Sequence, residues 1–354
     1  MKRAIFSLMM ATAVLLSTAV TCQDPVNPDP NEITLTYGAY FLNSGHADME
    51  DAELCQLNTI YATVNQNIFA QANVDKKLGS NATDIHLFGK RMYVAVNGSK
   101  RISVMDKLTC QELGSITVRS ESGETLSPRA ITSYEDALLV SFDEGYLASI
   151  DTAYLKARVV IPVGNAPRDL AIAGQKLYVA NTGSNTLQVL NPVTLDIMNT
   201  VTVAAGPKKL MADDGSNSLF VICDGGDDNT SLYHVDTNND AASLVSGVTK
   251  PTLMEMSSTG LIIYTKDSND DLGGRFQLLD TSTLKITSSF ISDGSFVKYP
   301  SGIFVDPNTK NVYIGENEAS AGGTIYIYTA IGQYVTSFST KSYLPCGAVF
   351  ITSL

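Results

Sequence analysis

The chain has 354 residues, with 24 Lys and Arg against 36 Asp and Glu, which gives a formal net charge of -12. An acidic chain is poorly suited to nucleic-acid binding, because that binding depends on Lys and Arg neutralising phosphates. With 44% hydrophobic and only 17% charged residues, the composition also excludes a disordered chain and permits a large core.

Residues 1–21 have the build of a secretory signal peptide, with Lys2 and Arg3 before an apolar stretch that ends in small residues. Their removal changes the net charge from -12 to -14. Cys22 then stands where a bacterial lipoprotein carries its acylated cysteine, and residues 22–35 form a polar, Pro-containing tether. The alternative is ordinary signal-peptidase cleavage near Cys22. We therefore predict an exported lipoprotein at the outer-membrane surface, attached to the membrane only by its N-terminal lipid, or a periplasmic protein if Cys22 is not acylated.

A short unit recurs along the rest of the chain, led by Pro and followed by an apolar run, as in "APRDLAIAG". The leading position is occupied in turn by Ala82, Pro128, Pro167, Pro207, Pro251, Pro300 and Pro345. The successive spacings are 46, 39, 40, 44, 49 and 45 residues. A period of this length is typical of propeller blades and not of helical solenoids.

Each unit contains short runs of β-branched, aromatic and Leu residues, separated by Gly, Asn, Asp and Pro. In one complete unit we expect strands at 168–173, 176–181, 186–191 and 198–203. The last unit supplies a single strand, whereas residues 36–71 supply three strands with no innermost partner. We therefore predict an all-β, seven-bladed β-propeller at residues 36–354, built from four-stranded antiparallel blades. Its ring would be closed by the C-terminal strand pairing with the N-terminal strands, which removes free sheet edges.

The third run of most units ends in Asp or Asn, followed within three residues by Thr in several copies. These residues are Asp106, Asp151, Asn191, Asp236 and Asp280. Carboxylates are attractive as catalytic groups, but Asx side chains also cap tight turns by bonding their own backbone two residues on. Because every copy falls at a predicted hairpin, we expect turn residues.

The repeated P-x-x-L followed by "KLYVAN", together with "NGSKRISVMD", resembles the YncE-like seven-bladed propellers. The lipoprotein-like start and "LGSNATDI" resemble the surface propellers of gut Bacteroidetes, which include the corrinoid-binding, BtuG-like group. The resemblance covers roughly residues 36–354. It implies a protein that captures a corrinoid (vitamin B12) and hands it to a TonB-dependent outer-membrane transporter. The shared motifs are structural, so they assign no binding residues of the family to positions in this sequence.

In a four-stranded blade, the loop between the second and third strands lies on the same face as the loop between blades. The loops on this face are long and irregular, as in "SGHADMEDAEL" and "DGGDDNT", whereas the turns on the opposite face are short and alike. Irregular loops on a rigid scaffold commonly bind ligands, although they can also be tolerated insertions. We expect the ligand site on the face with the irregular loops.

Two polar sets are expected near the central funnel on that face. Cations follow the leading Pro in three consecutive units, as Arg129, Arg168, Lys208 and Lys209. Polar residues stand at the ends of second strands, as Asn43, Asn97, Asn181, Asp224, Asp267 and Glu316. Together they suit a ligand rich in amides or hydroxyls. The alternative is that the cations and the carboxylates of these two sets form internal salt bridges across blades.

Aromatic residues on the same face are suited to stacking on a flat ligand such as a corrin or a sugar ring, although packing beneath loops explains them equally well. They are Phe142, Tyr146, Phe296, Tyr299 and Tyr343. Among the histidines, His46 lies in one of the irregular loops of this face, and we predict it as a ligand contact. His86 and His234 fall within strand runs, and we expect ordinary strand residues there.

The sequence contains no GxSxG, HExxH or phosphate-binding loop motif, which favours binding over catalysis. One enzymatic alternative remains, a Ca²⁺-dependent propeller hydrolase or lactonase. Its oxygen ligands would be Asn97, Asn181, Asp224 and Glu316. Another alternative is a scaffold for cell-envelope proteins, in which the acidic loops "DMEDAE" and "DSNDD" meet a basic partner.

The four cysteines after Cys22 have no CxxC spacing and no partner His at zinc-site distances, so a metal site is not expected. They are Cys55, Cys110, Cys223 and Cys346. We expect isolated buried thiols, with one disulfide left open.

Overall fold

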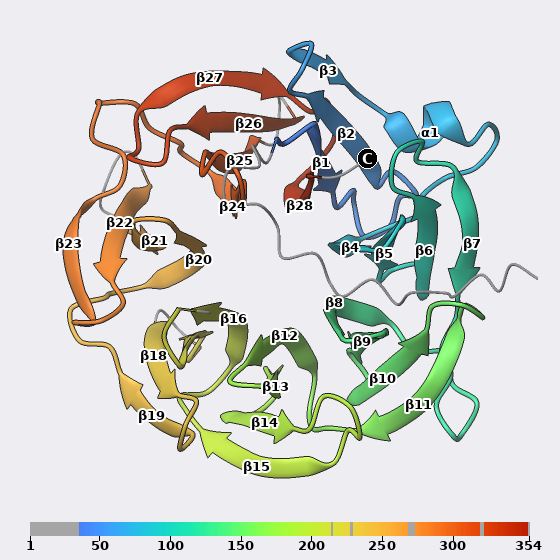
Figure 1. Ribbon diagram of the computed structural model, residues 1–354, viewed down its shortest axis with the longest axis horizontal. Coiled ribbons are helices and arrows are strands. Elements are labelled where there is room, and N and C mark those ends of the chain that lie inside the picture. The colour runs from blue at the N-terminus through green and yellow to red at the C-terminus, as the bar shows by residue number, and fades with distance from the viewer. Residues whose placement is uncertain (1–34, 214, 227–228, 268–272, 319–321, 353–354) are drawn as a thin grey trace, which may run out of the picture. The chain divides into compact units, whose positions relative to one another are not determined.

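The computed structural model describes one compact unit, Leu35–Leu354, except residues 214, 227–228, 268–272, 319–321 and 353–354. The expected signal peptide, Cys22 and all but the last residue of the tether lie outside the described residues. The unit consists of seven antiparallel four-stranded sheets set as blades around a common centre (Figure 1). The seven-bladed propeller predicted from the repeats is thus confirmed. In the described part of the chain, no helix is long and apolar enough to cross a membrane.

We number the blades along the chain and give the strands of each from the centre outward. Blade 1 contains β28 (Pro345–Ile351), β1 (Gly38–Asn43), β2 (Glu53–Asn58) and β3 (Thr63–Asn65). Blade 2 contains β4 (Ala82–Phe88), β5 (Arg91–Val96), β6 (Arg101–Asp106) and β7 (Glu112–Ile116), and blade 3 contains β8 (Pro128–Tyr134), β9 (Ala137–Phe142), β10 (Tyr146–Asp151) and β11 (Lys156–Pro162). Blade 4 contains β12 (Pro167–Ala173), β13 (Lys176–Asn181), β14 (Thr186–Leu190) and β15 (Ile197–Thr202), and blade 5 contains β16 (Pro207–Asp213), β17 (Ser218–Cys223), β18 (Ser231–Asp236) and β19 (Ala241–Leu244). Blade 6 contains β20 (Pro251–Ser257), β21 (Gly260–Lys266), β22 (Gly274–Asp280) and β23 (Lys285–Ser289), and blade 7 contains β24 (Pro300–Val305), β25 (Val312–Glu318), β26 (Gly322–Tyr328) and β27 (Tyr334–Ser339). A short helix, α1 (Ile68–Ala72), lies between β3 and β4.

The leading residue of every unit is the first residue of the innermost strand of its blade. Pro suits this position because the first residue of a strand does not need its N–H for the sheet. The innermost strands contact one another in the cyclic order β28, β4, β8, β12, β16, β20 and β24, and β24 contacts β28. The repeat therefore places the same sequence position of all seven units around the centre.

Blade 1 joins the two ends of the described unit. β28 pairs antiparallel with β1, so that Gly38 lies opposite Ile351 and Phe41 opposite Ala348. This is the predicted closure, with one C-terminal strand and three N-terminal strands in the same blade. Ring closure of this kind leaves only short, outer sheet edges exposed to solvent.

The apolar core lies between neighbouring blades. Between blades 1 and 7, the buried ring of Phe41 contacts the rings of Phe304, Tyr313 and Phe338, with centroid distances of 6.3, 5.6 and 5.7 Å. Aromatic pairs at such distances add stabilisation beyond their buried area. A blade therefore depends on its neighbours, because each buries its sheet faces against them.

The Asx residues at the ends of the third strands cap turns, as expected. Asp106 accepts hydrogen bonds from the N–H groups of Leu108, at 3.0 Å, and Thr109, at 2.9 Å. A bond from the N–H two residues later recurs at Asp151, Asn191, Asp236 and Asp280. These side chains lie on the face opposite the interblade loops and are turn residues.

All four cysteines in the described part of the chain are free thiols, so the disulfide left open by the sequence is not formed. Three are buried, and burial raises the pKa of Cys55 and Cys223 to about 12 and that of Cys110 to about 11. Thiols with such pKa values stay protonated and unreactive at neutral pH.

Candidate functional site

The innermost strands of all seven blades line a central cavity of about 530 Å³. We call it the funnel, and we call the face that carries the interblade loops the upper face. Two residues per blade form most of the lining, the first and the second after the leading position. The first set is Cys346, Thr83, Arg129, Arg168, Lys208, Thr252 and Ser301, and the second is Gly347, Asp84, Ala130, Asp169, Lys209, Leu253 and Gly302.

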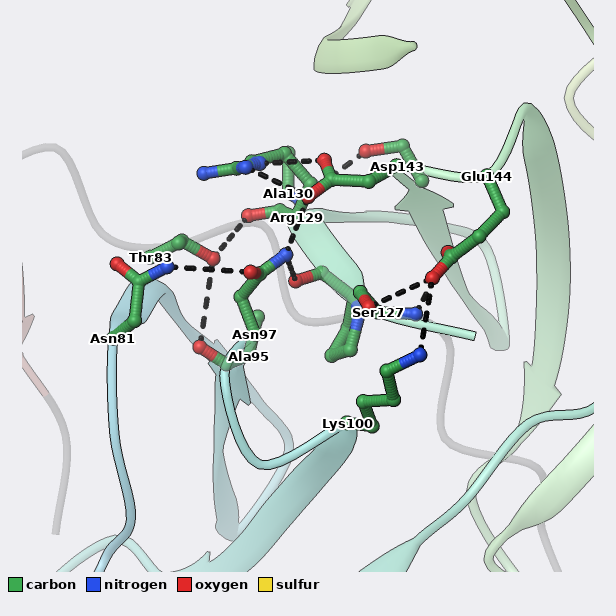
Figure 2. A network of polar contacts seen from close by, with 12 residues as sticks. Asn81, Thr83, Ala95, Asn97, Lys100, Ser127, Arg129, Ala130, Asp143 and Glu144 are labelled. Atoms are coloured by element: carbon green, nitrogen blue, oxygen red, sulfur yellow. Dashed lines mark hydrogen bonds and ion pairs between the residues drawn. The ribbon is translucent and has the colours of Figure 1, made fainter. Parts of the chain in front are cut away.

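The predicted cationic arc is present at the funnel, because Arg129, Arg168, Lys208 and Lys209 all line it. Three of these cations have an acidic partner. The Arg129 guanidinium donates to both carboxylate oxygens of Asp143, at 2.8 and 2.7 Å (Figure 2). The ammonium of Lys208 lies 3.1 Å from Asp224, and that of Lys209 lies 3.3 Å from Asp169. Of these three pairs, only Lys208–Asp224 joins a cation to one of the carboxylates considered from the sequence, and it lies within blade 5 and not across blades. Arg129 and Lys209 pair instead with Asp143 and Asp169, which were not in that set.

Arg168 differs from its neighbours. It is exposed, and among the described residues it has no hydrogen-bond or ion-pair partner. Although the side chain is exposed in the funnel, its partial desolvation by the surrounding blades and the nearby charge of Arg129 both lower its pKa. Arg168 is thus a cation at the funnel whose charge none of the described residues compensates.

Deeper in the funnel lie carboxylates that were not among the site residues predicted from the sequence. Asp84 of blade 2 accepts the N–H of Ile131 in blade 3, at 2.7 Å, and Asp169 of blade 4 accepts the N–H of Leu210 in blade 5, at 2.8 Å. These side chains therefore join adjacent innermost strands. They are readable in "NATDI" and "APRDL", where Asp stands two residues after the leading position.

Burial in the funnel raises the pKa of Asp84 to about 7, although the Ile131 N–H and the nearby Lys209 both favour its charged form. It also raises the pKa of Glu255 to about 7, against the opposing effect of Lys209. In turn, Asp169 raises the pKa of Lys209. Lys209 is thus the cation that stabilises the charged forms of these two half-buried carboxylates.

The polar residues at second-strand ends do not share one register. Asn43, Asn181 and Glu316 pair with the leading Pro of their blades, whereas Asn97 and Asp224 stand one residue further along. None of the five lines the funnel. The expected partial ring of convergent polar groups is therefore not formed by these residues.

The two asparagines predicted as ligand contacts are buried. Asn97 is 8% exposed and donates to the carbonyl of Pro128, at 3.1 Å, and to Asp143, at 2.8 Å (Figure 2). Asn181 is 1% exposed and donates to the carbonyl of Val163, at 3.1 Å. Both side chains hold the loops of the upper face in place. The described residues hold no group of three or more His, Cys, Asp or Glu side chains arranged for a metal ion.

Glu316 organises the loop between β23 and β24. Its Oε1 accepts the N–H groups of Lys298, at 2.8 Å, and Tyr299, at 3.2 Å, and its Oε2 accepts the hydroxyl of Tyr326, at 2.8 Å. In the same loop, the side chain of Val297 is buried in the core between blades 6 and 7. The loop is thus fixed while it presents Phe296 and Tyr299 to solvent, at 53% and 51% exposure.

We expect Glu316→Ala to lower the free energy of unfolding by about 1.5–3 kcal/mol, because it leaves two backbone N–H groups without their charged acceptor. Urea unfolding followed by circular dichroism measures the loss. Glu316→Gln is the matched control, since its amide oxygen still accepts both bonds, and it should lose less. Equal losses for the two variants would contradict this role.

The predicted aromatic contacts fall into three environments. Phe142 is 1% exposed and belongs to the core between blades 2 and 3, and the half-buried Tyr146 packs against the same core, so packing explains both. Phe296 and Tyr299 are exposed on the upper face. Tyr343, just before β28, stacks on His46, with ring centroids 4.1 Å apart and planes 19° apart. Of the aromatic set, Phe296, Tyr299 and Tyr343 are available to a ligand.

His46 and Tyr343 border a second cavity of about 480 Å³ on the upper face, between the β1–β2 loop, α1 and the β27–β28 loop. The Nδ1 atom of His46 lies 2.6 Å from Asp51, and its Nε2 atom has no partner among the described residues. His86 and His234 are strand residues, as expected. They bond the hydroxyls of Ser133 and Ser218, and burial lowers the pKa of His86 to about 4.

Comparison with known families agrees with this architecture. Residues 37–351 match the family described as "Domain of unknown function (DUF5074)". The chain belongs to the DUF5074 family. No curated protein sequence matches it.

Solved structures similar to this DUF5074 propeller have unrelated descriptions. They include a chain of Kuenenia stuttgartiensis hydrazine synthase, with 14% identity, a TM-score of 0.60 and coverage of 75% of this chain and 88% of that chain. The computationally designed Ika8 protein has 11% identity, a TM-score of 0.55 and coverage of 86% and 88%, respectively. A chain of a mitotic checkpoint complex has 10% identity, a TM-score of 0.60 and coverage of 96% and 92%. At these identities the likeness concerns the fold alone.

Proposed function

We propose that the protein is a ligand-binding propeller whose binding surface is the upper face around the funnel. The observation that carries this proposal is the cationic arc, which lines a cavity to which all seven blades contribute. Its volume of about 530 Å³ lies within the range of small-molecule sites. The exposed Phe296 and Tyr299 come from the loop between blades 6 and 7, on the other side of the ring from the cations of blades 3 to 5. The upper face thus offers charge on one side and aromatic rings on the other.

As the specific ligand we propose a corrinoid, on the strength of the resemblance to corrinoid-binding surface propellers. A corrinoid combines a broad macrocycle, peripheral amides and, in cobalamin, a phosphodiester. A molecule of this size would lie across the funnel and reach both the cations and the aromatic rings. The proposal includes acylation of Cys22, location of the lipoprotein at the outer-membrane surface and delivery of the ligand to a TonB-dependent transporter.

The proposal is tested by titrating the purified protein with cyanocobalamin and with cobinamide, using calorimetry and the corrin absorbance bands. We expect binding of one ligand per chain. The absence of heat and of spectral change at micromolar concentrations would overturn the corrinoid assignment.

Single substitutions at the contacts should weaken binding by about 1–3 kcal/mol each, the usual range for a contact that is desolvated in a complex. The substitutions are Arg168→Ala, Tyr299→Ala and Tyr343→Ala, and calorimetry measures each dissociation constant. Tyr154→Ala is the matched control, because Tyr154 is 76% exposed in the β10–β11 turn on the opposite face. Unchanged affinity in all three variants would contradict a binding surface on the upper face around the funnel.

A further inference from the structure

The charge of Arg168 is the one in the cationic arc that lacks a partner among the described residues. Three carboxylates are close enough to influence it, those of Asp143, Asp169 and Asp224. Each of them is already paired, with Arg129, Lys209 and Lys208, respectively. The described residues therefore hold three neutralised pairs around one uncompensated guanidinium.

The register of the blades explains why Arg168 has no partner in the part of the chain that the structure describes. In all seven blades, one residue of the second strand pairs with the leading position of the innermost strand. The residue that follows it in the chain donates its N–H to the carbonyl of the residue that precedes the leading position. In blades 3 and 5 this residue is Asp143 or Asp224, which pairs with the cation of the same blade. In blade 4 the equivalent residue is Thr182, whose hydroxyl donates to the carbonyl of Pro207, at 2.8 Å. Blade 4 thus keeps the cation and lacks the carboxylate.

We propose that Arg168 forms an oxyanion subsite at the funnel, which binds a carboxylate or phosphate group of the ligand in place of the missing acidic side chain. This inference rests on the proposed function and specifies the chemistry of its ligand. The guanidinium presents donors in a planar fork that matches both groups. Arg129 and Lys208 on the adjacent blades add positive potential, although both are paired. The ligand therefore carries at least one negative group, and this group lies over blade 4.

Inorganic phosphate and succinate serve as the two probes, because they separate a phosphate preference from a carboxylate preference. Each is titrated into the full-length protein at constant ionic strength while the side-chain Nε–H signals of arginine are followed by NMR. We expect a saturable shift with at least one probe. Arg168→Gln should weaken that binding about tenfold or more, the loss of a charge-assisted bidentate contact.

Two further variants separate a local subsite from a general effect of charge. Arg158→Gln removes the same charge from the outer strand β11, where Arg158 pairs with Asp136 and Asp151, and it should leave affinity unchanged. Thr182→Asp keeps Arg168 and supplies the carboxylate that blades 3 and 5 carry, so it should weaken binding as strongly as Arg168→Gln. Thermal unfolding of each variant establishes that it is folded.

The inference is overturned if neither probe binds the wild-type protein at millimolar concentrations, or if Arg168→Gln and Thr182→Asp bind as tightly as Arg158→Gln. These outcomes differ from failure of the corrinoid assignment. If cyanocobalamin does not bind but an oxyanion binds through Arg168, the subsite stands and the ligand is another anion.

Discussion

Removal of residues 346–354 is expected to abolish cooperative unfolding of the propeller. The deletion takes away nearly all of β28, which pairs with β1 and contacts β4 and β24, the innermost strands on either side. It opens the ring and exposes β1 as an unpaired inner edge, and the buried Val349 and Ile351 leave the core. Such a loss is comparable to the 5–15 kcal/mol that stabilise a typical protein.

The deletion is measured by thermal and urea unfolding of the truncated and full chains. A synthetic peptide of residues 343–354, added in excess, is the control, because it supplies β28 without a covalent link. We expect the peptide to restore a cooperative transition. A truncated chain that melts like the full chain without the peptide would contradict the closure.

The funnel carboxylates should make the protein less stable as the pH rises from about 4 to about 7. The pKa of Asp84 is raised from 3.8 to about 7 and that of Glu255 from 4.5 to about 7, so the folded chain binds both protons more tightly than the unfolded chain does. Linkage then requires the free energy of unfolding to fall between about pH 4 and pH 7 on account of these two groups. Below the pKa values of the unfolded chain, both carboxyl groups are protonated in the folded and in the unfolded chain, and their destabilising contribution disappears.

We expect the double substitution Asp84→Asn with Glu255→Gln to raise the free energy of unfolding at pH 8 by about 2–4 kcal/mol and to leave it nearly unchanged at pH 4. Urea unfolding across this pH range measures both values. Lys209→Met is the opposing variant, because it removes the cation that favours the charged carboxylates, and its stability should fall more steeply with pH than that of the wild type. Parallel pH profiles for all three proteins would contradict the argument.

The fold was predictable because its signals are local and repeated. The strands expected at 168–173 and 176–181 are β12 and β13 to within one residue, since Pro167 and the alternating apolar residues fix the start and the faces of these strands. The closure was predictable as well, because a lone C-terminal strand and three N-terminal strands complement each other. The role of Asp106 and its equivalents as turn residues was also predictable, because Asx side chains at hairpins cap the turn.

The site was predictable only in part, because side-chain partners depend on register and on contacts between distant segments. The sequence placed Arg129, Arg168 and Lys208 at the funnel, but it gave no reason to separate the paired cations from Arg168. That distinction requires an alignment of the blades that is correct to the residue. Only then does Thr182 of blade 4 fall at the position that Asp143 and Asp224 occupy in blades 3 and 5. The stacking of His46 on Tyr343 joins the two ends of the unit, and it follows only once the ring is closed.

The most direct test of the central claim, that the upper face binds the ligand, is hydrogen exchange of the full chain with and without saturating cyanocobalamin. We predict slower exchange in the β23–β24 and β27–β28 loops and at the starts of β8, β12 and β16, with no change in the turns between third and fourth strands. Protection confined to those turns, or no protection anywhere, would contradict the account.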